Sequence, residues 1–433
     1  MGKRVQRRRR SRGWGERVLI GLTALLALTL LGTGLWMREN AAESEEPPAS
    51  EPAPKPEPQP APEPESEEET EPILEPTAAD RLLSEMTLWE KVCQLLVVFP
   101  SDLTGVTQTT AAGEGTRQAL ESFPVGGILY DQNNLLNQKQ VQTMLTKVQT
   151  YSRIPLLLTC DEEGGRVSRL MKTIGTTKVG PMLDYCDQGV LKATENAAVI
   201  GRDLKNCGFN LDLAPVADVW SNPANTVIGD RAYSKDFSQA AKLVAGAVKG
   251  FHQSGVGCTL KHFPGHGDTK EDTHYASATV TKPLEELRRK ELRPFQAGIE
   301  AGADVVMMGH LTLPQVDPEP APFSYRLVTE LLREEMDFQG VVMTDGLRMK
   351  AMTDHYSSGE IAVKALSAGV DLLLCPEDPK AAASALVEAV QQGRIAQERL
   401  DESVLRVLTL KEKLGLLGEV SESEAPENVP SAP

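Results

Sequence analysis

Three of the six histidines of the chain lie within the fourteen residues "KHFPGHGDTKEDTH", which run from Lys261 to His274 and also hold two aspartates and two glycines. Imidazole and carboxylate groups at this density can bind a metal ion, bind a polar ligand or transfer protons. Packing alone does not require such a composition. The segment is therefore the first candidate for a functional site.

A metal site and a structural turn are two possible interpretations of this segment. His262, His266, Asp268 and His274 could all bind zinc, but a metal site usually takes ligands from several strands, and no His or Asp pair follows the first predicted strand. A structural turn would explain Pro264, Gly265 and Gly267. It does not explain Lys261, since a cation leaving a buried strand needs a partner or a ligand. We therefore expect no metal site and no cofactor.

The third interpretation is glycosidic chemistry. Glycoside hydrolysis needs one group that protonates the leaving oxygen and a second that stabilises or captures the oxocarbenium-like centre. A histidine with an unperturbed pKa of about 6.5 can act as acid and then as base near neutrality. Asp272 lies two residues before His274 and could orient its imidazole. Asp345, at the end of an apolar run in "VVMTDGLRM", could then be the nucleophile.

The elements that must position these residues are short apolar runs alternating with amphipathic helical stretches such as 284–302 and 326–338. This alternation is typical of parallel strands covered by helices. Eight such units between residues 78 and 417 predict an α/β fold, a (β/α)₈ TIM-type barrel in a single catalytic domain. An open doubly wound sheet would carry a GxGxxG after its first strand, and there is none. The eight runs are 95–99, 126–130, 155–160, 210–216, 257–262, 304–310, 340–345 and 371–375.

Polar side chains follow these runs where the chemistry of such a barrel is placed, at the carboxyl ends of the strands. They should converge on one mouth. They are Asp161, Arg231, Lys261, His262, His310 and Asp345.

The motifs "DEEGGRVSRL", "LDLAPVADV", "VIGDRAYS", "KHFPGHGDTKEDTH" and "VVMTDGLRM" occur in this order. Together they make residues 78–417 resemble glycoside hydrolase family 3, in its β-N-acetylhexosaminidase branch. The triplet Asp272-Thr273-His274 marks that branch, whereas the glucosidase and xylosidase branches take a carboxylic acid from elsewhere. Gly346 and Glu162 stand where relatives vary, and neither removes a catalytic group.

The resemblance implies a role for each matching residue. It implies Asp345 as catalytic nucleophile, His274 as proton donor and acceptor, and Asp272 as its supporting carboxylate. His310 is counted with the substrate-binding residues because of its place at a strand end. The resemblance implies that the sugar is held by Asp161, Arg169, Arg231, Lys261 and His262.

The expected activity is that of a retaining exo-β-N-acetylhexosaminidase that removes terminal β-linked N-acetylglucosamine from peptidoglycan or its fragments, by double displacement through a glycosyl-enzyme on Asp345. Three alternatives stay open. One is a β-glucosidase or xylosidase of the same family. Another is a substrate-assisted mechanism using Asp161 and Glu162. The third is an inactive, membrane-tethered protein that binds wall glycan.

The N-terminal region indicates export. Residues 1–17 carry eight Lys or Arg against one Glu, and residues 18–37 contain no charge. A helix of this length would cover roughly 30 Å, the hydrocarbon thickness of a bilayer. We expect a single-pass anchor in a bacterial-type cell membrane, with a cytoplasmic basic segment and an extracellular catalytic domain. The alternative is a cleaved signal peptide and a secreted protein.

Acidic segments flank the predicted domain. Residues 38–77 are rich in Pro and Glu and should form a disordered spacer, and residues 418–433 a disordered acidic tail. Residues 1–17 contribute +7 to the net charge of −16, residues 41–76 −11 and the tail −4, which leaves −8 for the folded part. This mild acidity argues against a nucleic-acid partner. The partners expected are a glycan or muropeptide and the membrane, with a monomeric chain. The six cysteines form no CxxC pair and are predicted to be buried free thiols.

Overall fold

The computed structural model describes residues 75–270 and 278–417. The predicted segments 1–17, 18–37 and 418–433, and the predicted linker up to residue 74, lie outside these residues. Within the described part of the chain, no helix has the length and apolar character needed to cross a bilayer. All six cysteines are free thiols, as predicted, and five of them are buried while Cys186 is partly exposed.

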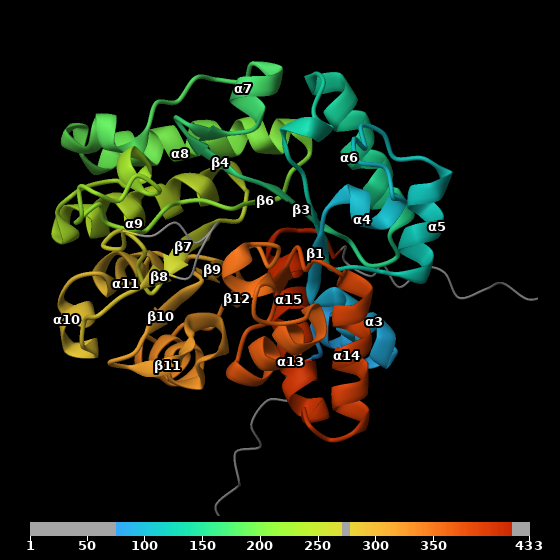
Figure 1. Ribbon diagram of the computed structural model, residues 1–433. Helices are drawn as coiled ribbons and strands as arrows, with labels where there is room; N and C mark the ends of the chain where they lie inside the picture. Colours follow the sequence, from blue (N-terminus) through green and yellow to red (C-terminus); the bar gives the residue numbers. More distant parts are fainter. Residues whose placement is uncertain (1–74, 271–277, 418–433) are drawn as a thin grey trace, which may run out of the picture. The chain divides into compact units, whose positions relative to one another are not determined.

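Parallel strands occur at all eight predicted positions, near the centre of Figure 1, with helices around them. Every residue of these eight strands is buried, which explains why their sequences are largely apolar, because parallel sheets are covered on both faces. The strands are β1 (Leu96–Val98), β2 (Gly127–Leu129), β3 (Leu157–Cys160), β6 (Leu211–Asp212), β7 (Thr259–Phe263), β9 (Val305–Met308), β12 (Val341–Thr344) and β13 (Leu373–Leu374).

The strands pair in two groups. One group has the order β13-β1-β2-β3-β6, and the other has the order β12-β9-β7. Isolated parallel bridges join the groups on both sides. Leu211 pairs with Gly257 and Val216 with Lys261 between β6 and β7, while Met343 pairs with Leu372 between β12 and β13. Each strand therefore has a parallel neighbour on both sides.

Helices connect the strands and pack in neighbouring pairs, including α8 with α9, α9 with α11, and α13 with α14. Helix α9 shows why they form: the Asp236 side chain accepts a hydrogen bond from the Gln239 N–H at its start, and Gly255 ends it with a φ of 72°. The longer helices are α2 (Ala78–Glu85), α3 (Leu88–Gln94), α5 (Glu114–Ser122), α6 (Gln138–Tyr151), α8 (Gly189–Cys207), α9 (Phe237–Ser254), α11 (Leu292–Glu300), η5 (Arg326–Glu335), α13 (Ser358–Ala368), α14 (Pro379–Gln391) and α15 (Gln397–Lys413).

Short elements lie in the connections. The hairpin of β4 (Glu162–Gly164) and β5 (Val167–Ser168) follows β3, and β8 (Ala278–Thr279), β10 (Leu311–Leu313) and β11 (Asp317–Pro320) form a separate small sheet. The short helices are α4 (Pro100–Thr104), η1 (Gln132–Asn134), α7 (Leu170–Ile174), η2 (Met182–Gln188), η3 (Gly229–Arg231), α10 (Leu284–Arg289), η4 (Ala321–Phe323) and α12 (Lys350–Thr353).

The predicted helical stretch 284–302 is two helices, α10 and α11, with a break at Lys290, where φ is −127° and ψ is −92°. Pro294 explains the break. Its ring would clash with the carbonyl of residue 290 in a continuous helix, and it has no N–H to donate. Placed in the first turn of α11, it disturbs no internal hydrogen bond.

Candidate active site

Six of the predicted site residues line one cavity of about 160 Å³ at the carboxyl ends of the strands. Asp161 follows β3, Lys261 and His262 lie on β7, and Asp345 follows β12. Arg169 follows the β4–β5 hairpin, and Arg231 ends η3. The predicted convergence at one mouth is confirmed for Asp161, Arg231, Lys261, His262 and Asp345, but not for His310, and Arg169 joins them.

Lys261 lies at the centre of a buried ion-pair network. Its Nζ atom is 2.7 Å from Asp161 Oδ1 and 2.7 Å from Glu163 Oε1. Arg231 binds the same Glu163 with two nitrogens, each 2.8 Å from a carboxylate oxygen. Arg169 contacts Asp161 at 3.3 Å and Asp131 at 2.9 Å. The cations are thus held in fixed positions before any ligand binds.

The network keeps its groups charged. Burial alone would raise the pKa of Glu163, but Arg231 and Lys261 outweigh it and hold that pKa well below the usual range. Burial would likewise lower the pKa of Lys261, yet Asp161 and Glu163 raise it above the ordinary value. An ammonium ion and a guanidinium ion therefore face the cavity at neutral pH.

Asp218 orients the histidine side of the cavity. Its Oδ2 atom lies 2.6 Å from His262 Nδ1, and its two oxygens accept hydrogen bonds from the backbone N–H groups of His262 and His266. With Nδ1 engaged, Nε2 of His262 is the ring nitrogen available to a ligand. Burial lowers the pKa of His266, a further cavity residue, and favours its neutral form.

Asp345 is prepared to act as a carboxylate. Its Oδ1 atom accepts a hydrogen bond of 2.7 Å from the Gly346 N–H. Burial would raise the pKa of Asp345, but His262 and His310, with that hydrogen bond and Lys261, hold it below the ordinary value. His310 is not among the lining residues of the cavity. Its Nε2 atom lies 3.0 Å from the Gly346 carbonyl oxygen, directly beside Asp345.

The glycines of the opening segment let its loop approach the chain after β6. A Cβ atom on Gly267 would lie 1.8 Å from the carbonyl oxygen of Val219, and Gly265 has a φ of +125°. Asp268, weighed above as a zinc ligand, instead accepts a hydrogen bond from Ser221 and pairs with Lys282. Asp272 and His274 lie outside the described residues, so their catalytic roles stay predictions.

Sequence reasoning missed Glu163, Asp218 and Asp131. A signal for Glu163 existed, because residues two apart in an extended segment point to the same side, so Glu163 accompanies Asp161 while Glu162 points away. Glu162 accepts hydrogen bonds from the backbone N–H groups of Arg169 and Leu170, at 2.6 and 2.7 Å. No comparable pattern indicated Asp218 or Asp131, because their partners, His262 and Arg169, come from other parts of the chain.

Fold and cavity together define an α/β protein with a charged cavity at the carboxyl ends of its parallel strands. Residues 87–410 match the model described as "Glycosyl hydrolase family 3 N terminal domain", and the chain belongs to this family. The resemblance noted from the motifs is confirmed.

Proteins similar to this chain are named as hexosaminidases or as an N-acetylglucosaminidase. The chain is 37% identical over 282 residues to "Beta-hexosaminidase" of Stenotrophomonas maltophilia, covering 63% of this chain and 82% of that protein. It is 32% identical over 327 residues to "Beta-hexosaminidase A" of Pseudoalteromonas piscicida, covering 69% of this chain and 55% of that one. A family 3 β-N-acetylglucosaminidase structure from a Paenibacillus species has a TM-score of 0.73 and 39% identity over 80% of this chain and 66% of its own. The chain thus spans little more than half of the Pseudoalteromonas protein and less than two thirds of the Paenibacillus one.

Replacing Glu163 with Gln should destabilise the fold by about 3–5 kcal/mol at neutral pH, because Lys261 and Arg231 lose the charge they share in a buried site. Urea unfolding of the two proteins measures the difference. The matched control is Glu285→Gln, since Glu285 is exposed and its loss should change the free energy of unfolding by less than about 0.5 kcal/mol.

The difference in free energy of unfolding between wild type and Glu163→Gln should depend on pH. Because the pKa of Glu163 is lower in the folded state than in the unfolded state, its contribution is complete above an unfolded pKa of about 4.3 and declines as the pH falls toward the folded pKa. The difference between wild type and Glu163→Gln should therefore be full at pH 7 and shrink in acid. A difference that is constant with pH would show that charge is not its cause.

Proposed function

We propose that the protein is a retaining exo-β-N-acetylhexosaminidase that releases terminal β-linked N-acetylglucosamine. The observation that carries this proposal is the meeting of Asp345 with Lys261, Arg231, Asp161 and His262 around one small cavity. Carboxylate and imidazole accept and share hydrogen bonds of sugar hydroxyls, while Lys and Arg donate to hydroxyl and acetamido oxygens. The names of the relatives above agree with this substrate.

The proposed mechanism is double displacement. Asp345 attacks the anomeric carbon while His274, oriented by Asp272, protonates the leaving oxygen. His274 then takes a proton from the water that hydrolyses the glycosyl-enzyme. The lowered pKa of Asp345 supports its role, since the nucleophile must be ionised.

The rival substrate-assisted mechanism has less support. It needs Asp161 and Glu162 to face the same sugar. Asp161 lines the cavity, but Glu162 does not, and its carboxylate accepts the backbone hydrogen bonds at the start of α7. Burial does raise the pKa of Glu162, as a general acid would require, yet the group is directed away from the site.

We also propose a closed barrel, exo action and a location at the cell membrane. The unbroken series of parallel neighbours supports closure of the eight strands as a (β/α)₈ barrel. A cavity of about 160 Å³, well below the roughly 300–1,000 Å³ of pockets for larger ligands, fits one sugar ring and hence exo action. The basic and apolar N-terminal segments and the acidic spacer support anchoring in the cell membrane and action outside it on peptidoglycan or its fragments. The chain is proposed to act as a monomer.

A panel of chromogenic β-glycosides tests the substrate. With the full chain in mild detergent, we expect kcat/KM for the N-acetylglucosaminide to exceed that for the glucoside and the xyloside by at least about 10²-fold, because a site built around the acetamido group penalises its absence. Comparison with the N-acetylgalactosaminide tests whether the protein distinguishes the configuration of the sugar at C4. Equal turnover of glucoside and N-acetylglucosaminide would contradict the proposal, and turnover of none would favour a glycan-binding protein.

A further inference from the structure

A second cluster of reactive side chains lies at the opposite, amino-terminal ends of the strands. Cys258 directly precedes β7, and Asp304 directly precedes β9. His252 comes from the last turn of α9, and Lys413 is the last residue of α15. Four elements therefore meet at one point, which the proposed reaction does not use. Of these, α9 and β7 follow each other in the chain, whereas β9 and α15 come from further along it.

The ligand atoms of three of these residues are close together. His252 Nε2 is 2.8 Å from Asp304 Oδ2. One ligand atom from each of His252, Cys258 and Asp304 lies within 4.8 Å of the other two. Adjacent ligand atoms around tetrahedral zinc lie roughly 3.3–3.7 Å apart, since the bonds are about 2.0–2.3 Å long. Shifts of about an ångström or less in these ligand atoms would convert the present arrangement into the spacing of a tetrahedral zinc site. Cys258 and the Asp304 side chain are fully buried.

We propose that His252, Cys258 and Asp304 form a binding site for a divalent cation of the Zn²⁺ class. The donor set of thiolate, imidazole and carboxylate favours zinc over the hard cations Mg²⁺ and Ca²⁺, which prefer oxygen ligands alone. Three protein ligands leave a fourth position for water or a backbone oxygen.

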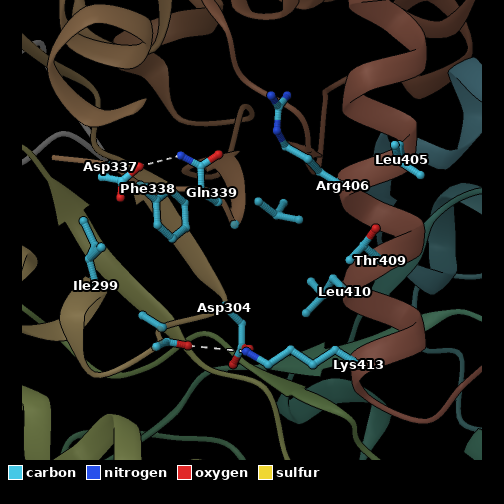
Figure 2. A pocket seen from close by; sticks show the side chains of 14 residues that line it. Ile299, Asp304, Asp337, Phe338, Gln339, Leu405, Arg406, Thr409, Leu410 and Lys413 are labelled. Atoms are coloured by element: carbon cyan, nitrogen blue, oxygen red, sulfur yellow. Dashed lines mark hydrogen bonds and ion pairs between the residues drawn. The ribbon is translucent and has the colours of Figure 1, made fainter. Parts of the chain in front are cut away.

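A cavity of about 490 Å³, shown in Figure 2, borders the cluster at Asp304 and Lys413, whereas His252 and Cys258 are not among its lining residues. Ile299, Phe338 and Leu410 are among its walls, and Asp304 and Lys413 meet at one end of it. The Lys413 side chain is 54% exposed, so it can withdraw into solvent.

The Lys413 ammonium group occupies the position beside Asp304 that the metal ion would take. Its Nζ atom lies 2.5 Å from Asp304 Oδ1 and 3.4 Å from the carbonyl oxygen of Gly302. When the metal binds, the Lys413 ammonium leaves Asp304, the Cys258 thiol gives its proton to solvent, and His252 binds through Nε2 as a neutral imidazole. The thiolate and the carboxylate then balance the two charges of the ion. The metal would tie α9 to the starts of β7 and β9.

Cobalt(II) titration of the full chain, stripped of metal with a chelator, tests the site. The wild type should take up one Co²⁺ with a thiolate-to-cobalt charge-transfer band, which the histidines of the active site cannot produce. Cys258→Ser should lose the band and weaken binding at least about tenfold. The matched control Cys207→Ser, which removes another buried thiol, should keep both. Lys413→Met should bind Co²⁺ more tightly, because the competing ammonium is gone.

His252→Gln, with the thiol retained, provides a second variant if Cys258→Ser does not fold, and it should shift the band and weaken binding. The proposal fails if the wild type shows no charge-transfer band, if Cys258→Ser keeps it, or if Cys207→Ser loses it. In those cases the cluster is a hydrogen-bonded junction around Asp304. The readout is spectroscopic and does not depend on glycosidase activity. Cys258→Ser without metal should retain the activity of the wild type.

Discussion

Asp345→Asn should reduce kcat on an N-acetyl-β-glucosaminide by at least about 10⁴-fold, since the amide cannot form the glycosyl-enzyme. The fold should survive, because Asn is nearly isosteric and can still accept the hydrogen bond from the Gly346 N–H. Steady-state kinetics and thermal unfolding of the same preparation separate the two effects. The control Asp354→Asn changes an exposed aspartate in the same connection after β12 and should leave kcat unchanged.

A covalent trap makes the assignment specific. A 2-fluoro glycoside slows both steps and, with a good leaving group, should leave the labelled sugar on Asp345, where peptide mass spectrometry can locate it. The Asp345→Asn protein should remain unlabelled. Label on another carboxylate, or a variant that retains turnover, would remove Asp345 from the mechanism and reopen the substrate-assisted alternative.

The strands were predictable from the sequence for a physical reason. Each is buried on both faces, so its sequence is largely apolar, and all eight predicted runs contain a strand. Their ends were less predictable, because the limits of pairing depend on neighbouring strands: the run 210–216 supplies only the two residues of β6, Leu211–Asp212. The helix break before α11 had a local cause, Pro294, and could have been foreseen.

Some residues of the site were predictable from the sequence and others were not. Asp161, Lys261 and Asp345 were predictable because each ends an apolar run. The side on which Glu163 lies could also be predicted, from its spacing of two residues from Asp161, but its partner Lys261, 98 residues away, could not. Asp218 was not predictable, because its partner His262 lies 44 residues away. The same holds for the His252, Cys258 and Asp304 cluster, which the sequence analysis did not anticipate. Buried polar groups are paired across elements, and such pairing leaves no periodic trace.

His274→Ala should separate substrates by their leaving groups. With a natural glycan, whose leaving oxygen must be protonated, kcat/KM should fall by about 10²–10⁴-fold. With an aryl glycoside whose leaving group needs no proton, kcat/KM should change far less. His355→Ala, which removes an exposed histidine, is the control. Equal losses on both substrates would contradict the role of His274 as acid.

The pH dependence of kcat/KM tests the roles of Asp345 and His274 together. In the wild type, the acidic limb of kcat/KM should reflect ionisation of Asp345, whose pKa lies below the ordinary value. The basic limb should reflect loss of the His274 proton. His274→Ala should therefore lose the basic limb while keeping the acidic one. Hydrolysis of the glycosyl-enzyme should also slow, since no base activates water. Azide, which attacks without a base, should then restore aryl glycoside turnover in this variant and leave Asp345→Asn inactive.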